Sequence, residues 1–167
     1  DAAICTLMPR LRAALLAKAE LSRKLFGAEF LATLSGEMLV TLIYHRKLDV
    51  AWEEAARCLA AELQIGLIGR SKGQKIVVGR DWVLEQLAVE GRQLQYQQFE
   101  GSFSQPNGGV NRQMLGWACA QATGLGGDLL ELYCGNGNFT MALARHFDRV
   151  LATELAKPSV RAAQYNL

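Results

Sequence analysis

The sequence predicts an α/β protein with two regions, an α+β region over residues 1–98 and the first part of a doubly wound parallel sheet over residues 99–167. Two observations predict this class. Helical and strand-like apolar patterns alternate in the first region, and a glycine-rich turn joins a strand to a helix in the second. Hydrophobic residues make up 50% of the chain and charged residues 20%, which excludes a disordered protein or a coiled coil.

The first region is predicted to open with a helix and a β-hairpin. Pro9 suits the first turn of the helix. One face of this helix carries Leu7, Leu11, Leu15, Leu21 and Leu25. After it, Phe30–Leu34 and Met38–Tyr44 are apolar or alternating segments on either side of Ser35-Gly36-Glu37, which is the pattern of two strands and a short turn.

A second helix and a second hairpin are expected next. Asp49 is a suitable N-cap for a helix over Val50–Leu63. Its apolar stripe consists of Trp52, Ala56, Leu59 and Leu63. Ile65–Gly69 and Lys75–Val78 then flank a turn at residues 70–73, and Asp81 is predicted to cap a short helix that runs through Leu87.

Basic residues gather at the tip of this second hairpin. Arg70, Lys72, Lys75 and Arg80 occur between Ile68 and Arg80 without an acidic residue. The net charge of +2 is too small to indicate a polyanionic partner by itself. A loop tip is nevertheless a place from which side chains reach a partner, and a solvated charged loop is the other interpretation.

The second region is predicted to begin with a helix and a buried strand. Asn107 is a suitable N-cap for a helix that carries Val110, Met114 and Trp117. Asp128–Tyr133 is an almost continuous apolar run, which is typical of a parallel strand buried on both faces.

The next segments of the sequence predict a βαβ unit. Residues 134–137 form a tight Cys-Gly-Asn-Gly turn, Asn138–Phe147 is predicted to be helical, and Val150–Thr153 is a second buried strand that ends at Glu154. Pro158 fits the first turn of one more helix. Two strands do not complete a doubly wound sheet, so we expect this Rossmann-like domain to be truncated and the chain to be part of a longer protein.

The glycine turn and the following acid predict a nucleoside-containing cofactor. Gly135 and Glu154 are separated by the roughly 20 residues that such sites have between the turn and the ribose-binding carboxylate. A dinucleotide site has a third glycine or alanine at the position that Thr140 occupies. S-adenosylmethionine, which has no pyrophosphate, is therefore favoured over NAD, and a nicotinamide enzyme stays an alternative.

Several segments resemble the tRNA (uracil-5-)-methyltransferase family. They are SFSQPN, ELYCGNGNF and ATELAKPSVRAAQYN, with FLATLSGEMLVTLIYHRKLDVAW and LIGRSKGQKI also similar. The resemblance implies transfer of a methyl group from S-adenosylmethionine to C5 of the T-loop uridine in tRNA. Related 23S rRNA uridine methyltransferases have phenylalanine at the position of Tyr133 and lack the QPN and KPSVRAAQYN segments, so they are the second candidate.

The resemblance also implies site residues. Gln105, Tyr133, Asn138 and Glu154 match the cofactor-binding positions of the family. Glu154 would hold the ribose, Tyr133 and Asn138 would frame the turn, and Gln105 would orient the cofactor or the target base. A loop amide that satisfies its own turn is the alternative for Gln105, and a core aromatic is the alternative for Tyr133.

No catalytic residue is expected in this chain, because the family has its nucleophilic cysteine and its glutamate base further downstream. Cys134, in the cofactor turn, is interpreted as a small packing residue. The same role is predicted for Cys5, Cys58 and Cys119. No pair of cysteines has CxxC spacing, so neither a metal nor a disulfide is expected, and the thiols suit a reduced compartment.

RNA contacts are assigned to four residues, and a fifth, Lys75, is a further candidate. Arg70 and Lys72 are candidates for phosphate contacts, together with Lys75. Phe26 and His45 are candidates for stacking on or bonding unpaired bases, although a lone histidine is often structural. The expected partner is the T-arm of tRNA, and an RNA-binding module without catalysis is an alternative. We further expect a cytoplasmic monomer without a membrane segment, since no stretch has the roughly 20 apolar residues of a span.

Overall fold

The computed structural model describes all 167 residues and divides into two compact units. The first consists of Asp1–Ala32 and Gly36–Val83, and the second of Thr33–Ser35 and Leu84–Leu167. This division falls before the sequence-based boundary between residues 98 and 99, because the strands over residues 84–99 pack with the helices that follow them.

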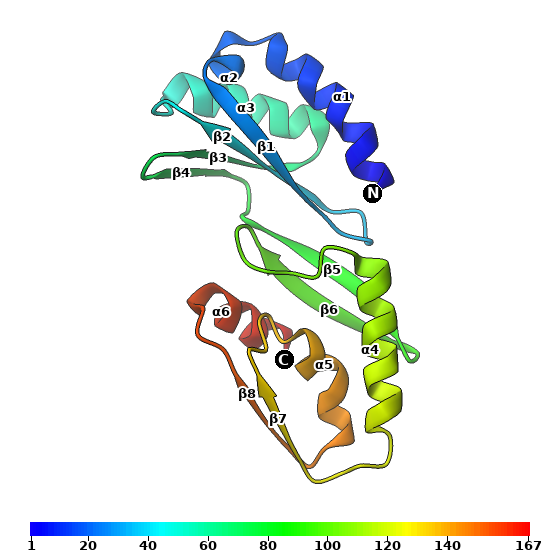
Figure 1. Ribbon diagram of the computed structural model, residues 1–167. Coiled ribbons are helices and arrows are strands. Elements are labelled where there is room, and N and C mark those ends of the chain that lie inside the picture. Colours follow the sequence, from blue (N-terminus) through cyan, green and yellow to red (C-terminus); the bar gives the residue numbers. More distant parts are fainter. The chain divides into compact units, whose positions relative to one another are not determined.

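The first unit is a four-stranded sheet with helices on one face (Figure 1). Its helices are α1 (Ala2–Leu16), α2 (Ala19–Ser22) and α3 (Val50–Leu63). Its strands are β1 (Leu25–Ala32), β2 (Met38–Tyr44), β3 (Gly66–Ser71) and β4 (Gln74–Val78). The order is β1-β2-β3-β4, with β2 and β3 parallel and the outer pairs antiparallel.

Side chains of α1 and α3 make the core of this unit with the sheet. The leucines predicted for one face of α1, at positions 7, 11 and 15, are buried, and so is the predicted stripe of α3. Trp52 is fully buried against Gly69, where an added Cβ would lie 2.3 Å from the Trp52 ring. The Asp49 carboxylate accepts a hydrogen bond from the Trp52 backbone N–H at 2.9 Å, which confirms the predicted cap.

Three predictions about the elements of residues 1–98 are wrong. Pro9 lies in the interior of α1 and not in its first turn, because the helix already begins at Ala2, where Asp1 caps it. Leu25 belongs to β1 and not to the first helix. The helix predicted from Asp81 to Leu87 is a strand, β5 (Trp82–Val89), that pairs with β6 (Arg92–Phe99). Burial in β5 alternates with a period of two, so the pairing with β6 outweighs the capping residue at its start.

The second unit contains the predicted βαβ arrangement. Besides β5 and β6, its elements are α4 (Gly108–Ala122), β7 (Asp128–Leu132), α5 (Asn138–Leu143), the short 3₁₀ helix η1 (Ala144–His146), β8 (Arg149–Thr153) and α6 (Lys157–Asn166). Strands β7 and β8 are parallel, with Asp128 opposite Arg149 and Leu132 opposite Thr153. The Asn107 carboxamide caps α4 by accepting from the Val110 N–H at 3.0 Å, as predicted.

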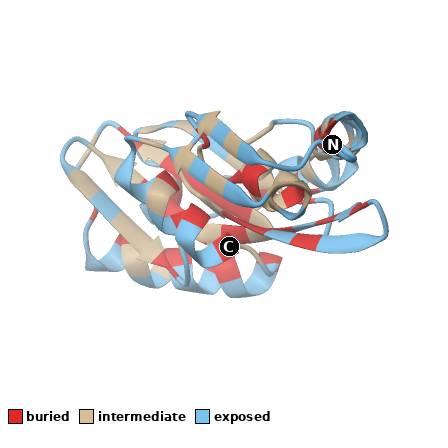
Figure 2. Ribbon diagram, turned by 90° about the horizontal axis from the view of Figure 1, so that it is seen from below, coloured by how far each residue is buried: buried red, intermediate tan, exposed pale blue.

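Burial in this unit differs from the prediction for its strands. Leu130, Leu132 and Leu151 are 60%, 59% and 63% exposed, so β7 and β8 are not buried on both faces. Exposed and half-buried residues alternate along them, because elements of this chain cover only one face of the pair. Figure 2 shows how burial varies along each element. No helix of the protein is both long enough and apolar enough to cross a bilayer.

Candidate functional site

The glycine turn between β7 and α5 reverses the chain within a few residues. Tyr133, Gly135 and Gly137 have φ values of 57°, 60° and 80°, in the left-handed region that glycine adopts without strain. The Cys134 N–H donates to the Thr153 carbonyl at 2.9 Å, and the Gly137 N–H donates to the Cys134 carbonyl at 2.9 Å. The turn therefore lies against the carboxyl end of β8, where a parallel sheet binds ligands.

Glu154 contacts this turn directly. One oxygen of its carboxylate accepts from the Gly135 N–H at 2.9 Å, and the other accepts from the N–H groups of Leu155 at 2.6 Å and Ala156 at 2.8 Å. The hydrogen bonds from the Ala156 and Leu155 backbone lower the pKa of the Glu154 carboxyl below its ordinary value. The two parts that the sequence linked by spacing alone thus touch each other, and the acid is held ionised.

Asn138, the first residue of α5, is held by residues of two other elements. Its side-chain amide forms a reciprocal pair with the amide of Asn111 on α4, with both N–H···O distances at 2.8 Å. Its backbone carbonyl accepts from the Tyr96 hydroxyl of β6 at 3.0 Å. Asn111 is 4% exposed, and its role was not found in the sequence because 27 residues separate the partners.

The other two predicted cofactor residues are more loosely placed. Tyr133, at the end of β7, is 86% exposed, so the interpretation as a core aromatic does not hold within this chain. Gln105 is half-buried in the loop between β6 and α4, and no hydrogen bond connects its side chain to the turn. The structure therefore brings Asn138, Glu154 and Tyr133 to one turn and leaves Gln105 on the segment that leads into α4.

A hydrogen bond from the buried Thr140 to the half-buried Glu131 explains the residue that replaces the third glycine. Thr140 is 2% exposed, and its hydroxyl donates to the Glu131 carboxylate of β7 at 2.5 Å. Burial raises the pKa of the Glu131 carboxyl. Thr140 thus ties α5 to β7, a long-range bond that the spacing of glycines did not predict.

The cysteines divide into two groups. Cys119 and Cys134 are buried, which confirms their predicted packing role, whereas Cys5 and Cys58 are exposed and the same prediction is wrong for them. Cys5 and Cys58 lie on the outer faces of α1 and α3, away from the leucine stripes. Burial raises the pKa of the Cys134 thiol, and the nearby carboxylates of Glu131 and Glu154 raise it further. A protonated thiol is a poor nucleophile.

In the first unit, a β-bulge directs Phe26 out of the sheet. Leu25 pairs with Tyr44 and Gly27 pairs with Ile43, so Phe26 is the extra residue of β1. Its ring is 69% exposed and stacks on the His45 ring, with the centroids 4.5 Å apart and an angle of 15° between the planes. The two aromatic candidates for RNA contact therefore form one exposed stack, which is called the platform below.

The loop that carries His45 is fixed by side chains beneath it. The Arg46 guanidinium, 8% exposed, donates to the carbonyls of Arg23 and Lys47 at 3.1 and 2.9 Å and also to that of Glu20. The Gln74 amide accepts from the Leu48 N–H at 2.9 Å and donates to its carbonyl at 2.8 Å. The platform is thus a pre-formed feature of the fold.

Basic side chains stand next to this platform. A pocket of about 620 Å³ is lined by residues 43–47 and 70–72, so it includes His45, Arg70 and Lys72. Lys75 points elsewhere, because its ammonium pairs with the Asp81 carboxylate at 2.8 Å. The structure therefore joins the four residues assigned to RNA and separates Lys75 from them.

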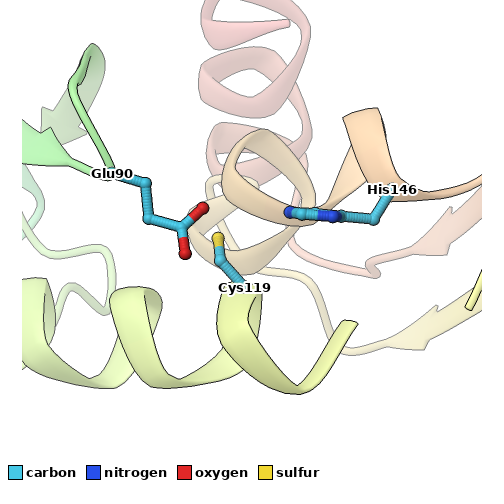
Figure 3. Close-up of side chains that lie close together, drawn as sticks. All are labelled: Glu90, Cys119 and His146. Atoms are coloured by element: carbon cyan, nitrogen blue, oxygen red, sulfur yellow. The ribbon is translucent and has the colours of Figure 1, made fainter. Parts of the chain in front are cut away.

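A second cluster was not predicted from the sequence. Glu90, Cys119 and His146 lie close together (Figure 3), and their potential metal-binding atoms are within 4.8 Å of one another. The Arg145 guanidinium already contacts the Glu90 carboxylate and donates to His146 Nε2 at 3.2 Å. The Cys119 thiol donates to the Ala142 carbonyl at 3.5 Å, and burial raises its pKa. Arg145 supplies the positive charge in this corner, and we assign no metal to it.

The fold and the turn define the class. A βαβ unit with a glycine turn, and an acid at the end of its second strand in contact with that turn, is a Rossmann-like nucleoside-binding arrangement. The chain belongs to the tRNA (Uracil-5-)-methyltransferase family, whose sequence model matches residues 1–167. This confirms the resemblance and the fold class expected from the sequence.

Named relatives agree with this family. The chain is 73% identical over 164 residues to the tRNA/tmRNA (uracil-C(5))-methyltransferase of Dechloromonas aromatica (strain RCB), a match that covers 98% of this chain and 45% of the relative. The enzyme of the same name from Aromatoleum aromaticum is 71% identical, with the same coverage. The chain thus spans less than half the length of these relatives.

A solved structure has the same fold. The chain is similar to the Pyrococcus abyssi tRNA (uracil-54, C5)-methyltransferase in complex with S-adenosyl-L-homocysteine, with a TM-score of 0.58 and 15% identity. The match covers 81% of this chain and 34% of that chain.

Proposed function

We propose that the chain is part of an S-adenosylmethionine-dependent methyltransferase that methylates C5 of the T-loop uridine in tRNA. The contact between the Glu154 carboxylate and the Gly135 N–H is the single observation that carries the proposal, since it joins the acid and the turn into one nucleoside site. Relatives of this chain are named for action on both tRNA and tmRNA, so a tmRNA with a similar loop is included as a substrate. We propose a monomer that acts in the cytoplasm, where tRNA is matured.

The residues of the turn fit the cofactor. An ionised carboxylate accepts about four hydrogen bonds, and Glu154 uses three for backbone N–H groups, so a ribose hydroxyl still finds an acceptor. Asn138 and Tyr133 flank the turn, and Gln105 lies in the loop before α4. Bound S-adenosylmethionine supplies an electrophilic methyl group, while Glu154 fixes the ribose and the turn lets the backbone approach the ligand.

The platform of the first unit fits an unpaired RNA base. Phe26 and His45 are stacked and exposed, and base stacking on an aromatic ring is worth about 1–3 kcal/mol. Arg70 and Lys72 beside them suit phosphate groups. We therefore propose that the T-arm contacts Phe26, His45, Arg70 and Lys72.

The reaction needs groups that we propose to lie outside this chain. A thiolate adds to C6 of uracil, the resulting enolate attacks the methyl group, and a base then removes the C5 proton while the thiolate leaves. Cys134 is unsuited to the first step, because its thiol is buried and held protonated. We therefore expect no methyl transfer by the isolated chain.

Radiolabelled methyl transfer to an unmodified T-arm RNA tests the proposal. The full-length gene product and this chain are assayed in parallel, with a T-arm whose target uridine is replaced by cytidine and a 23S rRNA fragment as controls. The expected result is transfer by the full-length protein alone and only to the uridine T-arm. Transfer to the rRNA fragment instead would assign the protein to the rRNA branch, and T-arm binding without transfer would leave an RNA-binding module.

A further inference from the structure

A buried amide on α4 has a single partner. Asn111 lies on the inward face of the helix in line with Leu115, Cys119 and Ala122, which are all buried. An apolar residue would suit this stripe, whereas asparagine is a poor helix former and must satisfy its amide out of water. Both side-chain hydrogen bonds of Asn111 go to the side chain of Asn138.

We infer that Asn111 is a positioning residue that fixes the orientation of the Asn138 side-chain amide at the glycine turn. Given the proposed function, Asn111 thereby holds that amide for the cofactor. In the reciprocal pair, each amide uses one N–H and one lone pair of its carbonyl oxygen, which leaves Asn138 with one N–H and one lone pair. If the Asn138 amide flipped alone, its N–H₂ would face the N–H₂ of Asn111 and the two oxygens would face each other, so the pair permits one orientation relative to Asn111.

The other contacts to the turn act on its backbone. The Tyr96 hydroxyl donates to the Asn138 carbonyl at 3.0 Å, and the Asn166 amide donates to the Asn136 carbonyl at 2.8 Å. These bonds place the main chain but leave the Asn138 amide free to rotate about its last side-chain bond. Asn111 alone controls that rotation, and the half-buried Asn138 keeps its remaining polar atoms accessible.

A double-mutant cycle on the full-length protein tests the inference. The dissociation constant of S-adenosylhomocysteine is measured by calorimetry for the wild type, Asn111→Leu, Asn138→Ala and the double variant. We expect Asn111→Leu to weaken binding about tenfold in the wild-type background and less than about twofold in the Asn138→Ala background. Equal loss in both backgrounds would mean that Asn111 only stabilises the fold, and would overturn the inference.

Two further variants keep the test decisive. Asn107→Ala removes the side-chain cap of α4 without touching the amide pair, so it lowers the melting temperature but leaves the dissociation constant within about twofold. Asn111→Asp retains the size of the side chain and loses the N–H₂ donor. If Asn111→Leu does not fold, the aspartate variant takes its place in the cycle with the same expected pattern.

Side-chain amide NMR of this chain separates the inference from the proposed function. In the wild type, the Asn138 side-chain N–H proton that bonds the Asn111 oxygen should exchange slowly with solvent, and Asn111→Leu should abolish this protection. If the wild-type protein bound no S-adenosylhomocysteine but showed the protection, the proposed function would fail and the positioning role would stand. Free exchange in the wild type would overturn the positioning role whatever the binding result.

Discussion

The two pairs of parallel strands in this protein have similar apolar sequences but different surroundings. Along β2 and β3 in the first unit, Leu39, Val40 and Ile68 are at most 1% exposed. Along β7 and β8 in the second unit, Leu130 and Leu151 are 60% and 63% exposed. An apolar run thus specifies a strand, whereas the burial of that strand depends on the elements that pack on each of its faces.

The largest expected loss of stability is in the first unit, where helices cover one face of the sheet. Trp52→Ala should lower the free energy of unfolding of the first unit by about 3–5 kcal/mol. The Trp52 ring is fully buried against Gly69, so its removal would leave a cavity. Chemical denaturation followed by circular dichroism measures the loss. A loss below about 1 kcal/mol would contradict the burial described for α3 and β3.

The same truncation in the two strand pairs tests the comparison directly. Leu39→Ala in β2 should cost about 2–5 kcal/mol. Leu130→Ala in β7 should cost less than about 0.5 kcal/mol in this chain, since its side chain is mostly in solvent. Urea titrations of both variants under one set of conditions give the two values, and equal losses would abolish the contrast.

Because the first unit has a complete core, its exposed platform can be removed without unfolding it. Phe26→Ala should weaken T-arm RNA binding about tenfold through loss of base stacking and leave the melting temperature nearly unchanged. Fluorescence anisotropy measures the affinity. Leu16→Ala, at another exposed apolar residue of this unit (63%), is the matched control and should not change RNA binding.

Two lysines of the basic hairpin differ in their pairing. Lys72→Ala should weaken T-arm RNA binding and reduce the slope of log K against log salt by about one. Lys75→Ala should leave the slope unchanged, since the Lys75 ammonium pairs with Asp81. Salt titrations of RNA affinity distinguish the variants, and a reduced slope for Lys75→Ala alone would reverse the assignment.

The smallest effect is a contrast in pH dependence within the second unit. The pKa of Glu154 is lowered, so its contribution to stability is present above the ordinary pKa of 4.5 and is lost as the pH falls through the folded value. The pKa of Glu131 is raised, so its contribution is present below 4.5 and is lost as the pH rises through the folded value.

The two glutamine variants should therefore show opposite trends. Relative to the wild type, Glu154→Gln should lose stability as the pH rises from acid to neutral, and Glu131→Gln should gain it. Denaturation midpoints across this range measure both trends. If both variants changed in stability with pH in the same direction, the direction of the pKa shift of Glu154 or of Glu131 would be wrong.

Elements with local determinants could be predicted from the sequence. The Asp49 cap, the stripe of α3 and the glycine turn each depend on residues within a few positions of one another. The sequence predicts a helix where the structure has β5, because the strand forms through pairing with β6 and a capping residue such as Asp81 carries no information about that pairing. The predicted burial of β7 and β8 is too high, because an apolar run does not reveal which elements pack on each face of the strand.

The sequence predicts which residues belong to the candidate site but not the contacts between them. Glu154 and Gly135 were linked through a known spacing, and the structure adds the hydrogen bond between them. Asn111 and the Glu131 carboxylate have no recognisable motif, since their partners lie on other elements. The sequence indicates Phe26 and His45 as candidates for contact with bases but not their contact with each other, since their stacking depends on a bulge that the alternation of β1 does not reveal.

That bulge has a consequence for insertions and deletions in β1. A one-residue deletion elsewhere in a strand moves every following side chain to the opposite face of the sheet. Phe26 is unpaired in the ladder, so loss of its codon would leave Leu25 and Gly27 to pair in a regular register with Tyr44 and Ile43. The sheet of the first unit can thus gain or lose its aromatic platform in one step, while its hydrophobic core keeps the same residues.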